Sequence, residues 1–105
     1  MIARFWTAKT SQAQAPVYAD HLKNHVLAAL SGIDGYAGAK LLKRETDDGV
    51  EMIVITFWRS LDAIRKFAGD DTERAVVSDE IAPLLLYCDQ RVRHYDVVVE
   101  DDVNG

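Results

Sequence analysis

Residues 50–69, VEMIVITFWRSLDAIRKFAG, decide the fold of this chain. They predict a strand over residues 51–59 that runs directly into a helix over residues 60–68. Side chains alternate between the two faces of a strand. In the middle of this predicted strand, over residues 52–58, Thr56 is the one polar residue. One face carries Ile53, Ile55 and Phe57, and the other carries Met52, Val54 and Trp58. Because an antiparallel strand with one wet face alternates apolar and polar residues, both faces of this strand need cover.

The rest of the chain predicts a long helix, three more strands and two short helical segments. The long helix has Thr10 or Ser11 as its cap and Pro16 in its first turn, and Ser31 and Gly32 end it. Its buried stripe is Tyr18, Leu22, His25, Val26, Ala29 and Leu30. The other strands are predicted over residues 2–8, 36–45 and 91–100, and the short helical segments over residues 73–77 and 80–87.

This order, βαββαβ, is typical of the ferredoxin-like α+β fold, in which two helices cover one face of an antiparallel four-stranded sheet. The other sheet face is left open, and the strand over residues 51–59 is apolar there too. Two such faces packed together form a dimeric α/β barrel, so we expect a homodimer through the open sheet face. We expect one domain over residues 1–100 and a frayed acidic tail over residues 101–105.

Composition excludes several classes of function. The chain has 105 residues, a net charge of −5 and no cluster of Lys and Arg, so nucleic acid is not an expected partner. No apolar run is long enough to span a membrane, and no secretory signal is visible. The single cysteine, Cys88, cannot form an internal disulfide and fits a reducing compartment. We therefore expect a cytoplasmic protein.

Five stretches resemble the antibiotic biosynthesis monooxygenase family of dimeric α/β-barrel proteins, and together they span almost the whole chain. They are IARFW at residues 2–6, GYAGAKLLKRE at 35–45, WRSLDAIRKFAG at 58–69, RAV at 74–76 and VRHYDV at 92–97. The resemblance implies a homodimer with one cavity per subunit, between the sheet and the helices. Some members of the family oxygenate phenolic polyketides with molecular oxygen and use neither metal nor flavin, so no cofactor is expected.

Other members of that family degrade haem. Those proteins use an Asn on the first strand, a Trp late in the second helix and a His ten residues after that Trp. The first position falls on Trp6 or Thr7 in this chain, the second on Phe67 and the third on Val77. Since none of the three matches, we do not expect haem degradation.

A cofactor-free oxygenation needs a base with a near-neutral pKa, and histidine is the natural choice. His94 on the last strand is one candidate, with Asp96 on the same face to orient it, and His25 on the buried stripe is the other. The alternatives are a hydrogen-bonded structural or interface histidine at His94 and a satisfied core histidine at His25. His21 lies four residues before His25, but no further ligand completes a metal site, so no metal is predicted.

The same chemistry needs aromatic walls and an anchor for an anion. The candidate substrate-binding walls are Trp6, Tyr18, Trp58 and Phe67, and core packing is the alternative for each. Arg4 shares the parity of Trp6 and is the candidate anchor for a substrate anion, with a salt bridge across the sheet or the dimer interface as the alternative. Cys88 follows a predicted helix end, where the dipole disfavours a thiolate, and is interpreted as a packing residue.

Two hypotheses of different class follow. The first is a cofactor-independent monooxygenase that oxidises a small aromatic or enolic compound with oxygen, with His94 or His25 as the base. The second is a homodimer of the same fold that binds a small metabolite without catalysing its conversion. The first rests on the resemblance, since fold alone does not fix a reaction.

Overall fold

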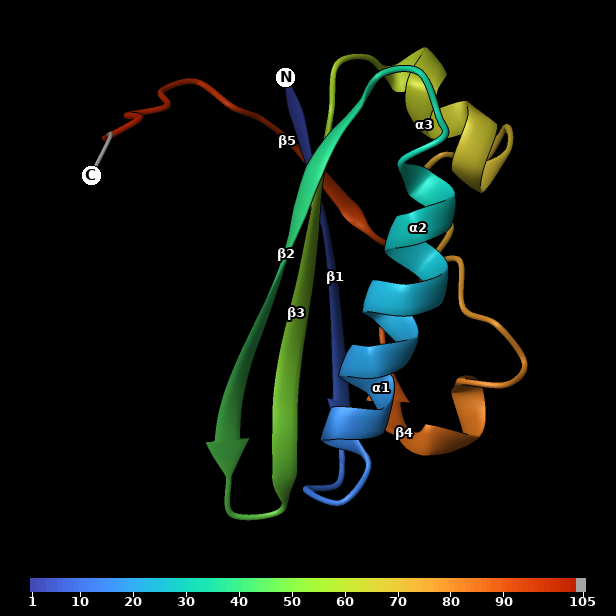
Figure 1. Ribbon diagram of the computed structural model, residues 1–105, viewed down its shortest axis with the longest axis vertical. Coiled ribbons are helices and arrows are strands. Elements are labelled where there is room, and N and C mark those ends of the chain that lie inside the picture. The colour runs from blue at the N-terminus through green and yellow to red at the C-terminus, as the bar shows by residue number, and fades with distance from the viewer. Residues whose placement is uncertain (104–105) are drawn as a thin grey trace.

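The computed structural model describes residues 1–103 and consists of one sheet with helices on one of its faces (Figure 1). The strands are β1 (Ile2–Thr10), β2 (Tyr36–Thr46), β3 (Gly49–Trp58), β4 (Leu85–Cys88) and β5 (Arg93–Asp96). The helices are α1 (Ala15–His21), the π-helix η1 (Leu22–Val26), α2 (Leu27–Leu30), α3 (Leu61–Ala68) and the 3-10 helix η2 (Ala82–Leu84).

All strand pairs are antiparallel, and the order across the sheet is β2-β3-β1-β4, with β5 also paired to β1. Along the β1–β3 ladder, Ile2 lies opposite Trp58 and Thr10 opposite Val50. The far edge of β1 is shared, because β5 pairs with its first half and β4 with its last residues. The predicted α+β, ferredoxin-like architecture is therefore confirmed.

Local sequence explains how the elements around β3 begin and end. Gly49 follows the turn from β2 with a φ of 148°, and a Cβ on it would lie 2.5 Å from the backbone oxygen of Thr10. Only glycine fits that close approach. Ser60 caps α3 as predicted, since its Oγ accepts a hydrogen bond of 3.1 Å from the Ala63 amide, and Gly69 ends the helix with a φ of 85°.

The helix-facing side of the sheet holds two core clusters. The first lies under α1 and η1 and is built from Tyr18, Leu22, Met52 and their neighbours. The second lies under α2 and α3 and is built from Leu30, Trp58, Ala63 and Ile64. Even-numbered residues of β1 and β3 face the helices. Their side chains therefore line the sheet side of the space between the two clusters.

The predicted helices over residues 73–77 and 80–87 are wrong. The first segment contains a turn and a bridge from Arg74 to Arg91, and the second contains η2 followed by β4. The edge of β1 explains the difference, since Thr10 donates a hydrogen bond of 2.6 Å from Oγ1 to the Leu84 oxygen and its backbone pairs with Leu85. Hydrogen bonding to the otherwise unpaired edge of β1 stabilises the extended conformation of this segment more than its helical spacing of apolar residues favours a helix. The last strand is also shorter than predicted, at Arg93–Asp96.

The long predicted helix is present but is interrupted by η1, and this interruption moves His25. A π-turn holds more residues than an α-turn, so the side chains after Leu22 are rotated relative to a continuous α-helix. Tyr18, Leu22 and Leu30 stay buried, whereas His25 is exposed. The prediction that His25 belongs to the buried stripe is therefore wrong.

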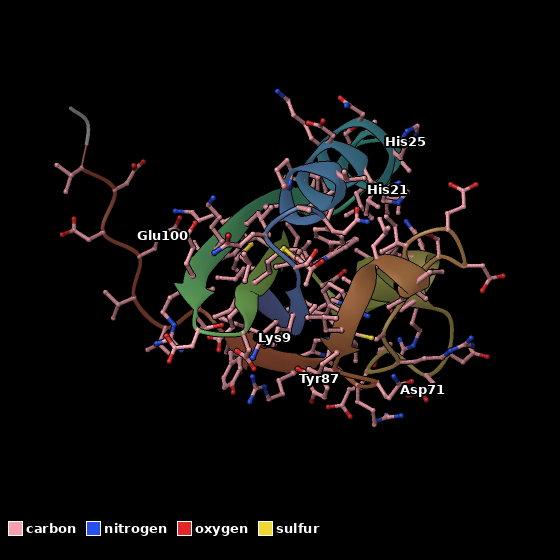
Figure 2. All side chains as sticks on the ribbon, turned by 90° about the horizontal axis from the view of Figure 1, so that it is seen from below. Lys9, His21, His25, Asp71, Tyr87 and Glu100 are labelled. Carbon is pink, nitrogen blue, oxygen red and sulfur yellow. The ribbon has the colours of Figure 1, made fainter. Side chains whose placement is uncertain are left out.

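The helices leave the other sheet face uncovered, and its centre is apolar. That face carries Ala3, Phe5, Ile53, Ile55, Phe57 and Tyr95, and the rings of Phe5 and Tyr95 meet edge to face. The chain beyond β5 runs away from the helix layer, and Glu100 projects from it (Figure 2). Of the predicted tail, residues 101–103 are exposed and without regular structure, and residues 104–105 lie outside the described residues. No helix within residues 1–103 has the length and apolar character needed to cross a bilayer.

Candidate functional site

A cavity of about 310 Å³ lies between the helix-facing side of the sheet and the helix that runs from α1 to α2. Four residues of the connection between α3 and β4 line it as well: Val76, Val77, Ser78 and Ile81. The wall is mostly apolar. Its members from β1 and β3 are Arg4, Trp6, Val54 and Thr56, those from the helices are Tyr18, His21, Leu22, His25, Val26, Ala29, Leu30 and Phe67, and the rest are Val76, Val77, Ser78, Ile81 and Val92.

Two aromatic side chains form a fixed wall at one side of the cavity. The ring of Trp6 is held by a hydrogen bond of 2.9 Å from its Nε1 to the Asp89 oxygen. Tyr18 is 5% exposed, and its ring centroid lies 6.1 Å from that of Trp6. Burial, with a smaller effect of Cys88, raises the pKa of Tyr18 far above its ordinary value, so its hydroxyl stays protonated. The two rings are inclined at 32° to each other, so the wall is angled, and the held Trp6 ring offers one face to a planar ligand.

Phe67 of α3 lines the cavity, but Trp58 does not. Trp58 is 0% exposed and packs in the second core cluster, between Tyr36 and Phe67. Its ring is stacked on that of Phe67 at a centroid distance of 6.0 Å. Trp58 was predicted as a wall residue, and the structure places it behind the wall, where it supports Phe67.

His21 and His25 both line the cavity from the helix side, and their ring centroids lie 5.2 Å apart (Figure 2). His25 is exposed and His21 is half-buried, so the two imidazoles lie where the cavity meets solvent. The structure brings no group of three or more His, Cys, Asp or Glu side chains within residues 1–103 into a metal-binding arrangement.

Arg4 is the one strongly basic side chain on the cavity wall, and it is only 4% exposed. Its Nη2 donates a hydrogen bond of 2.8 Å to the Arg74 oxygen, and its guanidinium lies 5.5 Å from the centre of the Phe67 ring. Its Nη1 is buried and has no hydrogen-bond partner among residues 1–103. Burial lowers the pKa of Arg4 to about 10, which leaves it charged at neutral pH.

The salt bridge considered for Arg4 is not formed with any residue in the described part of the chain. None of the ion pairs within residues 1–103 includes Arg4. The side chain also lies on the helix-facing side of the sheet, not on the uncovered face. A buried cation without a counter-charge is costly, and the cavity is the space from which an anion could reach it.

His94 lies directly opposite Arg4 in the β1–β5 ladder but is not part of the cavity wall. Its Nε2 is buried and has no hydrogen-bond partner in the part of the chain that the structure describes. No hydrogen bond joins it to Asp96, which is exposed. Burial first, and then the charge of Arg4, lower the pKa of His94, while Glu73 opposes them. His94 is therefore neutral at pH 7 and sits behind Arg4.

Sequence reasoning missed Thr56 and the segment over residues 76–81. Thr56 is 7% exposed, lines the cavity and faces Arg4 across the β1–β3 ladder. Its signal was present, since it is the one polar residue in the middle of an apolar strand. The segment over residues 76–81 gave no such signal, because its apolar residues were interpreted as parts of two helices.

Comparison with known proteins shows what this architecture resembles. No protein-family model matches the chain, and no curated protein matches it. Solved structures do match over the full length. A single-residue variant of MhuD, the haem degrader of Mycobacterium tuberculosis, holds two manganese protoporphyrin IX molecules per active site and aligns with a TM-score of 0.69 at 19% identity, over 100% of both chains.

Two further structures carry monooxygenase names. A Bacillus cereus protein provisionally named an antibiotic biosynthesis monooxygenase aligns with a TM-score of 0.66 at 12% identity, over 97% of both chains. The monooxygenase ActVA-Orf6 of Streptomyces coelicolor, in complex with nanaomycin D, aligns with a TM-score of 0.63 at 15% identity, over 99% of this chain and 91% of that one. The structural neighbours of this protein thus include proteins named as antibiotic biosynthesis monooxygenases, another monooxygenase and a haem degrader, and at these identities the likeness establishes a shared fold.

Proposed function

We propose that this protein is a cofactor-independent monooxygenase that oxidises a small aromatic or enolic compound with molecular oxygen. The observation that carries the proposal is the cavity of about 310 Å³, which combines a rigid aromatic wall with one buried guanidinium that has no counter-charge. An apolar site with a single cation favours a flat ligand that becomes an anion during the reaction.

The reaction needs little from the protein. A base removes a proton from the CH2 carbon of the compound's keto form, and the resulting phenolate or enolate anion gives one electron to oxygen to form a radical pair with superoxide. The pair combines into a carbon–oxygen bond, and loss of water from the peroxide leaves a carbonyl, so that CH2 and O2 become C=O and H2O. The site must hold the ring, stabilise the anion and exclude water.

His25 is the base in this proposal. It lies at the solvent-facing side of the cavity, where it can take a proton from a bound ligand and pass it to water. His21 lies beside it and offers a second imidazole on the route to solvent. His94, the other predicted base, lies outside the cavity wall and has no direct path to a ligand.

The names of the structural neighbours support the proposed monooxygenase activity. ActVA-Orf6 is a monooxygenase whose structure contains nanaomycin D, and the Bacillus cereus protein carries a related name. MhuD binds porphyrins in its active site, but the positions that imply haem degradation hold Phe67 and Val77 here. Shared fold leaves the chemistry to the side chains.

We also propose that the protein works as a homodimer through the uncovered sheet face, in the cytoplasm. That face is apolar at its centre, and it includes Tyr95, which is 50% exposed, and Leu42, which is 46% exposed. An apolar sheet face of this kind is typical of a subunit interface, and a second copy with the same face would cover it symmetrically.

Oxygen uptake tests the proposal. The purified protein, dialysed against a chelator, is mixed with a panel of anthrones and hydroquinones in an oxygen electrode. We expect uptake of one O2 per substrate, and oxygen-18 from O2 in the product. Uptake no faster than in buffer across the panel would contradict the monooxygenase, and ligand-dependent thermal stabilisation without turnover would favour the metabolite-binding alternative.

A further inference from the structure

A row of three polar residues crosses the helix-facing side of the sheet at the level of the cavity. Arg4 on β1 lies opposite His94 on β5 and opposite Thr56 on β3. The next cavity-lining row along β1 consists of Trp6 and Val54, which lie opposite each other. Arg4 and Thr56 are therefore polar residues on a sheet surface that is otherwise apolar where it lines the cavity. Side chains that lie directly opposite in antiparallel strands have Cβ atoms roughly 5 Å apart.

Arg4 offers a free donor group at Nη1. Its Nη2 donates to the Arg74 oxygen, and its Nη1 has no hydrogen-bond partner among residues 1–103. Nη1 can therefore donate to an anionic oxygen while the bond to Arg74 is kept. A single oxygen that carries negative charge is the acceptor that this arrangement fits.

Thr56 supplies a second donor beside it. The Thr56 Oγ1 accepts a hydrogen bond of 2.8 Å from the Trp58 Nε1, and no acceptor for its own proton occurs among residues 1–103. A hydroxyl that accepts from an indole is polarised as a donor, and Thr56 lines the cavity. The Trp58 contact also fixes the oxygen, so that the hydroxyl need not be ordered on ligand binding.

His94 completes the row on the side away from the cavity. Its Nε2 has no partner, and the nearby charged groups are Arg4 and Glu73, of which Glu73 lies 3.7 Å from Arg91. No carboxylate of the described chain therefore neutralises Arg4 from behind.

We propose that Arg4 and Thr56 form an oxyanion site that binds the ionised hydroxyl oxygen of a phenol or enol, and that this site selects the substrate. The inference rests on the proposed function and names the substrate class more narrowly, as compounds with one acidic ring or enol hydroxyl and an apolar body. The apolar body lies against Trp6 and Tyr18, and the oxygen points to the sheet floor. Donors aimed at the anion stabilise it relative to the neutral compound, which makes deprotonation easier.

Binding of three matched probes tests the oxyanion site without turnover. The probes are 4-nitrophenol, 4-nitroanisole, which has the same shape but cannot ionise, and 4-nitrobenzoate, which carries a carboxylate. The buffer is set to the pH at which free 4-nitrophenol is half ionised. We expect the bound 4-nitrophenol to show an increased phenolate band, and 4-nitroanisole to bind at least about tenfold more weakly, as loss of a charge-assisted hydrogen bond predicts. We expect 4-nitrobenzoate to bind more weakly than 4-nitrophenol as well, because its second carboxylate oxygen would be buried against the apolar wall.

Variants locate the effect. Arg4→Gln and Thr56→Val should each reduce the phenolate preference, by about tenfold or more for Arg4→Gln, while Thr56→Ser should retain it. Ser78→Ala is the matched control, since it removes a hydroxyl from the cavity wall contributed by residues 76–81. Thermal melting of each variant shows that it is folded.

Three results would overturn the site. They are equal binding of 4-nitroanisole, stronger binding of 4-nitrobenzoate, and an unchanged phenolate band in folded Arg4→Gln. The two proposals can fail separately, since oxygen uptake that does not depend on Arg4 defeats only the oxyanion site. Binding of phenolate without oxygen uptake defeats only the monooxygenase.

Discussion

The indole nitrogen of Trp58 donates a hydrogen bond of 2.8 Å to Oγ1 of Thr56. Trp58 is fully buried in the core, whereas Thr56 forms part of the cavity wall. The bond thus joins the most buried aromatic side chain to a polar atom of the candidate site. It gives Thr56 a structural role in addition to the donor role proposed for it, and stability and binding measurements can separate the two.

Thr56→Val should lower the free energy of unfolding by about 1–3 kcal/mol, because it leaves the Trp58 Nε1 buried without an acceptor. Thr56→Ser should keep most of the stability, since its hydroxyl can still accept. Urea denaturation measures both. In the Thr56→Val, Trp58→Phe double variant the loss should be smaller than the sum of the two single losses, and strict additivity would show that the hydrogen bond contributes nothing.

Arg4→Met should leave the free energy of unfolding unchanged or raise it by up to about 2 kcal/mol, because it removes an unpaired buried charge and keeps an apolar chain of similar length. The same variant should lose the phenolate preference. Denaturation and probe binding on one preparation test both. A stability loss of several kcal/mol would show that Arg4 is held for the fold and not for a ligand.

Stability should fall as the pH drops below 6.5, and His94 should account for that fall. Burial and the charge of Arg4 lower the pKa of His94 in the folded state below its ordinary value of 6.5. Between the lowered pKa and 6.5, the unfolded chain therefore binds more protons than the folded chain. The contribution of neutral His94 to the free energy of unfolding is fully present above pH 6.5 and is lost as the pH falls through the lowered pKa. Asp48 and Asp71, whose pKa values are lowered from 3.8, act only at more acidic pH.

Thermal melting from pH 7.5 to 5 checks this expectation. His94→Asn should flatten the profile over that range, and His25→Asn, which changes an exposed histidine, should follow the wild-type curve. A profile that is equally steep in wild type and His94→Asn would assign the acid sensitivity to another group.

His25→Ala should lower kcat for oxygen uptake by about 10²–10⁴-fold, because the proposed general base is lost. Added imidazole should restore part of the rate. His21→Ala should have a smaller effect, since His21 only adjoins the proposed base. Full activity in His25→Ala would show that another group or solvent, and not His25, is the general base.

Ile53→Asp places a charge in the centre of the uncovered sheet face and should convert a dimer into monomers. Val17→Asp is the control, since Val17 is 49% exposed and lies on α1, away from that face. Sedimentation velocity at micromolar concentration measures both. A monomeric wild-type protein would contradict the dimer directly.

Strands β1, β2 and β3 and the helix that follows β3 could be predicted from the sequence alone. The two apolar faces of residues 51–58, the Ser60 cap and the glycine at position 69 act within a few residues of each other, so local pattern was sufficient. The same patterns identified Trp6, Tyr18 and Phe67, and all three line the cavity. The assignment of Arg4 to that wall followed from its shared parity with Trp6.

The positions of the remaining residues depend on the tertiary fold. The edge of β1 converted a predicted helix into β4, and the π-turn moved His25 from the buried stripe to the solvent side of the cavity. Trp58 went to the core, and Thr56 came to lie beside Arg4 through strand register. These outcomes depend on contacts between residues that are far apart in the chain, and local spacing carries no information on which partner such a contact will find.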